Sequence, residues 1–353
     1  MKTRYNIRCI LIFITLVFVC SQRVAAFSFN LDSIAQMGKF PRFVVNTYHW
    51  GDGFFNGYNQ EFVKPTGYKF NIKTKVDNWL DTYSFVLTDD VRMHMVSEPC
   101  SSLGFWLTYM AVSVGYDINL SKYFTGNSNN RKRFDFQFNC SLFAAELYLI
   151  SNDVGTTITR FGTGDDSYRV DIPFYGINTR TLTLDAYYFF NHKKYSHAAA
   201  FSFSREQVKS AGSLFAGFSY FDQRYSFDFS SLPYDMKQYL PASWNSQYSV
   251  NAKNYGIKLG YGYNWVVGRN WVLCLSEAPT IGVKRGFINV KSSEKWSFSL
   301  YNTLRMSAVW SNGRLFAGIL GRVETALFYD KEHTLFSNMV DLEISAGYRF
   351  NLW

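Results

Sequence analysis

The 353-residue sequence carries a formal net charge of +9 and contains 47% hydrophobic, 19% aromatic and 18% charged residues, with only 7 prolines. A chain this rich in residues that require burial is not intrinsically disordered, and its positive charge is too mild and dispersed for a nucleic-acid-binding protein. After residue 26, no apolar run approaches the ~20 residues of a membrane-spanning helix. The apolar residues alternate with polar ones instead, which favours β-strands.

The first 26 residues have the organisation of a secretory signal peptide. Three basic residues precede an apolar stretch from Cys9 to Cys20, and the small residues of Val24-Ala25-Ala26 follow. We therefore expect export and cleavage near Ala26. Cleavage before Cys20, as in a lipoprotein, is the alternative, and it is disfavoured because Val19 occupies a position where a small residue is expected.

Residues 27–67 do not follow the alternating pattern of the later chain. Residues 46–57 within this segment are dense in aromatic residues, Gly and Asn. We expect the segment to be a periplasmic entrance segment or a plug folded against the domain formed by residues 68–353.

The rest of the chain repeats a two-residue period typical of strands with one apolar and one polar face. The last stretch, from Val340 to Leu352, alternates without interruption, and it exceeds the roughly 9–11 residues of a membrane-spanning strand. In chain order, the clear segments are 68–73, 112–119, 134–142, 181–190, 254–265, 295–311 and 340–352, and the weaker ones are 103–109, 199–203, 214–229, 271–275 and 315–329.

Alternating strands occur in soluble sandwiches, with the apolar face inward, and in membrane barrels, with the apolar face toward lipid. The strand lengths favour a barrel, as do aromatic residues near strand ends, such as Trp296 and Trp310. We therefore predict an all-β fold: an antiparallel transmembrane β-barrel of about 12 strands (10–14) in an outer membrane. A soluble sandwich is the alternative.

Connection lengths support a barrel with short periplasmic turns and longer outer loops. Asn312-Gly313 is a typical tight hairpin turn, whereas 230–253 is long. Two expected connections depart from this pattern of short inner turns and long outer loops. They are a long inner connection at 162–176 and an outer turn at Lys193-Lys194, between His192 and His197.

The C-terminus resembles the β-signal by which assembly machinery recognises barrel precursors. Such recognition would add the last strand to an open sheet edge. The residues that carry this pattern are Gly347, Phe350, Leu352 and Trp353. The expected partners are therefore the barrel-assembly machinery and the surrounding outer-membrane lipid, including lipopolysaccharide.

Three short motifs add a family resemblance. They are Tyr48-His49-Trp50-Gly51-Asp52, Phe54-Phe55-Asn56-Gly57 and Ser102-Leu103-Gly104-Phe105. With the signal peptide, they resemble the uncharacterised Bacteroidota barrel family known as domain of unknown function 4421. The resemblance implies an outer-membrane-type barrel and carries over no activity or catalytic residues.

The polar strand faces supply the candidate functional surface, because they would line the lumen. We expect a channel or transport-type barrel for an unidentified small solute or lipid; the alternative is a structural or surface-binding barrel with a filled lumen. Aromatic residues of an outer loop, Tyr234, Tyr239 and Trp244, could bind ligands or simply pack. The candidate lumen charges are Lys258, Arg305, Arg322, Glu324, Asp341, Glu343 and Arg349.

The residues capable of catalysis or metal binding form no recognisable site. The five histidines are not spaced as metal ligands, and Met93-His94-Met95 fits packing. A barrel lipid hydrolase would need Ser, His and an orienting polar group on the outer face, and no His is expected on an outward row. We expect neither an enzyme nor a cofactor.

The cysteines left after export are Cys100, Cys140 and Cys274, an odd number without a C-x-x-C pattern. This spacing indicates neither a disulfide framework nor a zinc site. We expect free or partly paired thiols that pack as small hydrophobic side chains.

Overall fold

The computed structural model describes residues 42, 57–87, 90–120, 130–153, 155–163, 168–240, 246–288, 295–329 and 334–352. The expected signal peptide, residues 1–26, and most of the expected entrance segment, residues 27–67, lie outside this part of the chain. Their boundaries therefore stay predictions. Residues 54–350 form one compact unit, and every element below belongs to it.

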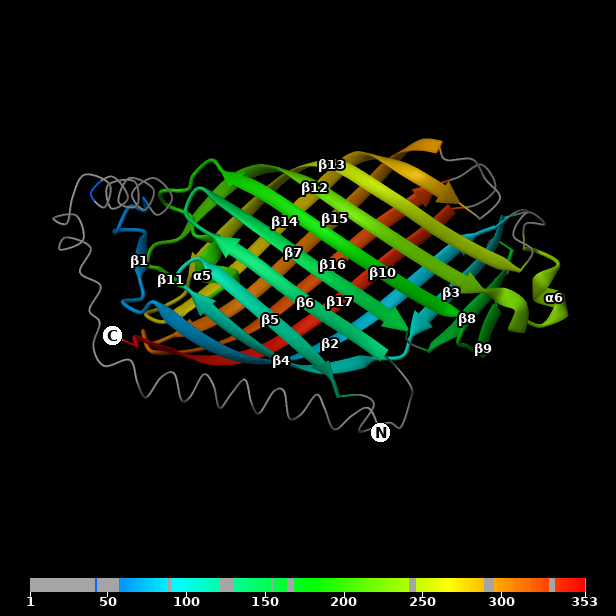
Figure 1. Ribbon diagram of the computed structural model, residues 1–353, viewed down its shortest axis with the longest axis horizontal. Helices are drawn as coiled ribbons and strands as arrows, with labels where there is room; N and C mark the ends of the chain where they lie inside the picture. Colours follow the sequence, from blue (N-terminus) through cyan, green and yellow to red (C-terminus); the bar gives the residue numbers. More distant parts are fainter. Residues whose placement is uncertain are drawn as a thin grey trace. The chain divides into compact units, whose positions relative to one another are not determined.

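A closed antiparallel barrel of twelve strands forms the body of this unit (Figure 1). Consecutive barrel strands are neighbours around the ring, and the last strand pairs with the first to close it. The barrel strands are β2 (Phe70–Val86), β4 (Cys100–Tyr109), β5 (Val112–Asn119), β6 (Asn130–Asn139), β7 (Phe143–Asp153), β10 (Ile177–Phe189), β12 (Ala211–Asp228), β13 (Gln247–Val266), β14 (Trp271–Ile288), β15 (Lys295–Ser311), β16 (Leu315–Tyr329) and β17 (Thr334–Phe350).

Alternation along each strand sorts side chains between the lumen and the outer wall. On β17, Ile344 is 53% exposed on the wall, whereas the neighbouring Ser345 is 4% exposed and points inward. The outer wall presents many exposed apolar side chains, among them Ile257, Leu259 and Ile281. This is the inside-out arrangement of a membrane barrel, in which the polar strand faces look into the lumen.

The two ends of the barrel differ in their connections. At the end that contains Phe70, Phe189 and Phe350, named here the turn end, most connections are short: residues 110–111, 140–142, 267–270 and 312–314. At the opposite end, the loop end, the described connections include additional folded elements. The sheet continues from β2 into β3 (Val91–Ser97), β8 (Thr156–Thr163) and β9 (Tyr168–Phe174), and a 3-10 helix, η3 (Phe229–Ser231), precedes α6 (Tyr234–Lys237).

One turn-end connection is long and folds inward. Residues 190–210 contain α5 (His197–Phe201) and β11 (Arg205–Gln207), and β11 pairs with β1 (Val63–Pro65). The Ser196 side chain caps α5 by accepting a hydrogen bond from the Ala199 backbone N–H. All five residues of α5 are buried, so this connection occupies lumen space rather than extending away from the barrel.

The predicted fold class is confirmed, and the barrel has the expected strand number. Five local predictions are wrong. Residues 199–203 were expected as a strand, but α5 covers 197–201. The strand expected over 134–142 ends at Asn139 because 140–142 form a turn. Residues 247–253 belong to β13 rather than to the expected loop 230–253.

The other two errors concern which end a connection lies at. The connection expected inside at 162–176 lies at the loop end, in the β8–β9 hairpin. The turn at Lys193-Lys194, expected outside, lies at the turn end and leads His197 into the lumen. Among the described residues, no helix is long and apolar enough to cross a membrane.

Candidate functional site

A buried ion pair crosses the lumen between β7 and β15. The Arg305 guanidinium donates to both carboxylate oxygens of Glu146, at 2.7 and 2.5 Å. Around the ring, four strands lie between β7 and β15 on one side and six on the other. His197 of α5 lies 3.4 Å from the same carboxylate through Nε2. The pair therefore joins nearly opposite walls and also contacts the inward-folded connection.

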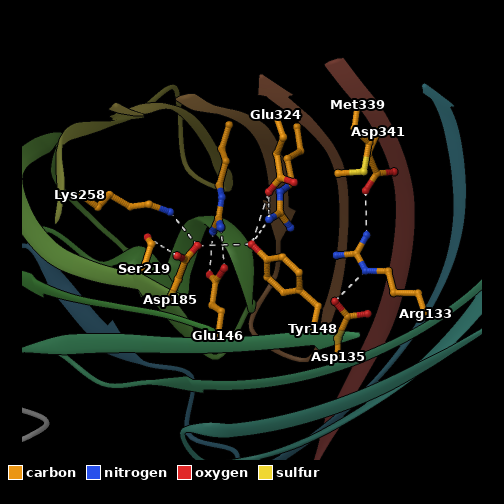
Figure 2. A network of polar contacts seen from close by, with 12 residues as sticks. Arg133, Asp135, Glu146, Tyr148, Asp185, Ser219, Lys258, Glu324, Met339 and Asp341 are labelled. Carbon is orange, nitrogen blue, oxygen red and sulfur yellow. Dashed lines mark hydrogen bonds and ion pairs between the residues drawn. The ribbon is translucent and has the colours of Figure 1, made fainter. Parts of the chain in front are cut away.

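A second polar cluster gathers around Asp185 of β10 (Figure 2). Its carboxylate accepts hydrogen bonds from Lys258 Nζ at 2.7 Å and from the Ser219 hydroxyl at 2.5 Å. The Tyr148 hydroxyl lies 3.4 Å from the same group. These partners come from β13, β12 and β7, so Asp185 ties together one side of the lumen.

Tyr148 extends this cluster to the far wall. Its hydroxyl oxygen accepts from the Arg322 guanidinium, which also donates to Glu324. Both residues lie on β16, and five strands separate β16 from β7 in either direction around the ring. The contact therefore spans the lumen between diametrically opposite strands.

Further lumen charges pair on the side of the ring that runs from β17 through β2 to β6. Arg133 donates to Asp135 at 2.7 Å and to Asp341 at 3.0 Å (Figure 2). Lys73 pairs with Glu343 at 2.7 Å, and Lys75 pairs with Asp117 at 3.0 Å. Opposite charges thus neutralise one another within a strand, between neighbouring strands and across intervening strands on this side of the ring, as expected for charges removed from bulk water.

At the turn end, the lumen is occupied by the connection that contains α5. The Arg349 guanidinium donates to the Phe203 backbone carbonyl at 3.0 and 2.7 Å. The Phe203 ring stacks on Phe316, with ring centroids 4.8 Å apart. Arg349 also donates to the Gly313 carbonyl at 2.7 Å, so one buried side chain links this connection to the adjacent turn.

Toward the loop end, the lumen is filled by a large apolar cluster. Aromatic side chains predominate at its centre, where Phe85 makes edge contacts with Phe227, Phe229 and Tyr248. Between this cluster and the ionic network lies a polar cavity of about 70 Å³, bordered by Asp81, Arg131 and Gln223 among others. Its volume suits a few water molecules.

The seven sequence-predicted lumen charges all lie on the inward row of their strands, and each has a polar partner. Asp341, Arg305, Lys258 and Arg349 contact residues of other strands or connections, and Arg322 and Glu324 contact each other. Sequence reasoning missed Glu146, Asp185 and Arg133, although each lies on an alternating strand. It also missed His197, because α5 carries no strand or helix period long enough to detect.

The other candidate residues are separated from this network. Tyr234 on α6 is exposed, and Tyr239 is half-buried against Phe161. Phe350 stacks on Phe70 at 5.5 Å, and a side chain at Gly347 would overlap the Phe316 ring. Leu352 is exposed, whereas Trp244 and Trp353 lie outside the described residues.

At the loop end of β2, the described residues contain a serine–histidine contact that sequence reasoning excluded. His94 Nδ1 lies 2.8 Å from the Ser84 hydroxyl, so a histidine does reach the row on which Ser84 lies. His94 lies on β3, outside the ring, and its charged neighbours are Arg160 and Arg92. No carboxylate in the described part of the chain orients the ring, so the third member of a hydrolytic triad is missing there.

The three described cysteines, Cys100, Cys140 and Cys274, are buried, and Cys140 and Cys274 are free thiols. The described residues contain no group of three or more His, Cys, Asp or Glu side chains that could hold a metal ion. Within those residues, the lumen is lined by charges that pair with one another.

Comparison with known proteins places the chain in a family. Residues 58–350 match the model described as Domain of unknown function (DUF4421), and the chain belongs to this family. The search of curated proteins found no match.

Several solved barrels resemble the structure at low identity. The outer membrane protease OmpT from Escherichia coli is 7% identical with a TM-score of 0.36, covering 80% of this chain and 96% of that one. The translocator domain of autotransporter NalP from Neisseria meningitidis is 12% identical with a TM-score of 0.29, covering 92% and 100%. Neisserial surface protein A is 8% identical with a TM-score of 0.24, covering 78% and 97%. At these values, the similarities carry no argument about activity.

Proposed function

We propose that this protein is an outer-membrane barrel with a closed lumen, which acts through its outer surfaces rather than as an open pore. The observation that carries the proposal is the contact of Tyr148 with Arg322 and Glu324 across the full width of the ring. The buried α5 connection and the loop-end apolar cluster support it from either side.

The outer wall supports the membrane location. Its exposed residues include Leu107, Ile257, Leu259 and Phe298, and water would hydrate such a surface at a high free-energy cost. Short connections at one end and elaborated ones at the other match outer-membrane barrels. We therefore assign the turn end to the periplasm and the loop end to the outside.

The ionic network explains why a closed state would persist. Removing one partner from a buried pair typically costs about 3–5 kcal/mol, because the remaining charge lacks compensation. Opening the lumen between β7 and β15 would separate Arg305 from Glu146 or rehydrate both groups. Thermal fluctuation alone would rarely open such a lumen.

Transport by a gated barrel is the second candidate function. The observation that favours it is that α5 belongs to a connection, not to the wall, and is held partly by polar contacts through His197 and Phe203. Displacing this connection would vacate the turn end without breaking any barrel strand. A small solute or lipid would be the cargo.

Conductance in planar bilayers tests the closed lumen. We expect the full-length protein to insert and give no steady single-channel current, whereas a porin measured in the same bilayer conducts. Frequent, stable openings of the wild-type protein would overturn the proposal and favour the transport candidate.

Thiol labelling gives an independent test of the turn end. Cys274 packs against Ala200 and Phe201 of α5, so its thiol reports on displacement of this helix. In a Cys100→Ser/Cys140→Ser background, we expect a membrane-impermeant maleimide to leave Cys274 unlabelled in the folded barrel. Rapid labelling of a heat-modifiable, folded sample would contradict closure.

We further propose that the protein has no hydrolytic activity. The Ser84–His94 contact is the nearest arrangement to a catalytic dyad in the described residues, and it lacks an acidic partner there. Assays with phospholipid and lipid A should show no turnover above that of the Ser84→Ala variant. Turnover by the wild type that is lost in this variant would overturn this assignment.

A further inference from the structure

The outer wall carries a basic groove between β6 and β12. It has a volume of about 370 Å³, and its outward-pointing charged residues are Lys132, Arg180, Arg224 and a single acid, Asp222. The three basic side chains are exposed. The strands that form it, β6, β7, β10 and β12, lie side by side on one wall (Figure 1).

The strand register brings the basic residues together in one row. Lys132 pairs with Ser151, Ser151 with Arg180, and Arg180 with Arg224. Arg180 and Arg224 are therefore directly opposite on adjacent strands, where like charges destabilise a sheet. The Arg224–Asp222 ion pair is long, at 3.8 Å, and Arg224 is exposed, so it compensates this repulsion only weakly.

Immediately toward the turn end, the wall becomes apolar. The next outward row contains Phe134, Leu149 and Leu182 before Asp222. The following row contains Phe136, Leu147, Leu184 and Tyr220. The groove thus combines a basic edge nearer the loop end with an apolar floor that continues toward the middle of the wall.

The combination of a basic edge and an apolar floor indicates what kind of molecule the groove can bind. Two adjacent arginines suit the oxygens of a phosphate group, to which guanidinium donates in bidentate geometry. An apolar floor below them suits acyl chains, which a soluble anion lacks. We infer that the groove binds the phosphorylated lipid A part of lipopolysaccharide, with its phosphate at Arg180 and Arg224. This inference rests on the proposed membrane location, in which the loop end faces outward.

Binding of purified bis-phosphorylated lipid A to the full-length protein in detergent tests the inference. We expect the Arg180→Gln/Arg224→Gln variant to bind about tenfold more weakly or worse, since two charge-assisted contacts are lost. The Arg169→Gln/Lys193→Gln variant removes equal charge at exposed sites away from the groove and should bind within about twofold of wild type. The Arg180→Lys/Arg224→Lys variant should retain part of the affinity, because the charge remains without the planar donors.

Three results would overturn the inference. The first is equal binding by the groove and control variants. The second is equally tight binding of dephosphorylated lipid A, which would mean that only the apolar floor contributes. The third is equal competition by phosphatidylglycerol, which would mean that the groove accepts any lipid phosphate.

Folding and location are checked on the same samples. Each variant should keep the heat-modifiable mobility of a folded barrel, because the substituted side chains are exposed. Folded, membrane-inserted wild type that does not bind lipid A would overturn this inference alone. Conductance would overturn the closed-lumen proposal alone, and a wild type that remains in the aqueous fraction would overturn both.

Discussion

Glu146 shows how strongly one residue can depend on its partner. Its buried carboxylate accepts hydrogen bonds from two guanidinium nitrogens of Arg305, and His197 Nε2 lies beside it. Replacing both members of a buried ion pair by apolar residues is often neutral, whereas removing one leaves an uncompensated charge. The stability of the lumen therefore depends on the pairing of these charges rather than on the presence of each one.

We expect Arg305→Met to lower the free energy of unfolding by about 3–5 kcal/mol, because the buried Glu146 carboxylate would lose its guanidinium partner and keep only the contact with His197. The Glu146→Leu/Arg305→Met variant should be close to wild type. Urea unfolding in lipid vesicles, followed by tryptophan fluorescence, measures both. A double variant as unstable as the single one would show that the pair is not the source of the effect.

His94 provides a titration outside the barrel ring. Burial, followed by the charges of Arg160 and Arg92, lowers the pKa of His94 from its ordinary value of 6.5. The folded chain therefore takes up this proton less readily than the unfolded chain. Its contribution to stability is fully present above about pH 6.5 and is lost as the pH falls from there through the lowered pKa of the folded state.

The NMR titration of the His94 ring should give a midpoint below 6.5 in the folded protein. Arg160→Gln should move this midpoint upward, since one repelling charge is removed. His94→Gln identifies the resonance by its disappearance. A wild-type midpoint at or above 6.5 would contradict the assigned environment.

The lumen side of each predicted charge could be read from the sequence, because side-chain direction alternates along a strand. This rule alone places the side chains of Lys258 and Arg349 on the lumen side. Their partners could not be predicted, since contact across a barrel depends on which strands lie opposite in the ring. Asp185 meets Lys258 only because β10 and β13 are brought within reach around β12.

Among the elements, strands with one lipid-facing row were the easiest to predict. The segment 315–329 coincides with β16, and 112–119 with β5. In contrast, α5 has only five residues and is buried throughout, so it offers no helical periodicity. The loop-end strands β3, β8 and β9 were missed because they belong to no lipid-facing wall and lack its uniform alternation.

On the lipid-facing row of β17, the loss of stability caused by a charged substitution should depend on its depth in the bilayer. Ile344 lies exposed near the middle of this strand, whereas Phe336 lies near its loop end. Ile344→Lys should lower the free energy of unfolding by about 2–4 kcal/mol and Phe336→Lys by about 0–1, because only the first places the charge near the bilayer midplane. Urea titration in lipid vesicles measures both values. Equal costs would contradict the assigned membrane position.

At the scale of the whole molecule, the chain closes by joining its first and last barrel strands. β17 pairs with β2 from Thr334↔Val86 to Phe350↔Phe70. The Phe70 ring contacts both Phe350 and Tyr109 at this seam, with centroids 5.5 and 4.7 Å apart. Because these strands are far apart in sequence, closure must await synthesis of the C-terminus and is slow without assistance.

The last residues allow closure to be separated from recognition by assembly machinery. β17 ends at Phe350, so deleting residues 352–353 leaves the seam intact, whereas deleting residues 350–353 removes the Phe70–Phe350 stack. If Leu352 and Trp353 belong to an assembly signal, the shorter deletion should reduce the amount of folded barrel in cells several-fold and leave refolding in detergent unchanged. The longer deletion should impair both, because the closing strand loses its end contact.

Heat-modifiable band intensity, in membranes and after refolding, measures the two effects. Wild-type assembly of the shorter variant in cells would exclude Leu352 and Trp353 from the signal, and a refolding defect in that variant would show that they stabilise the barrel itself.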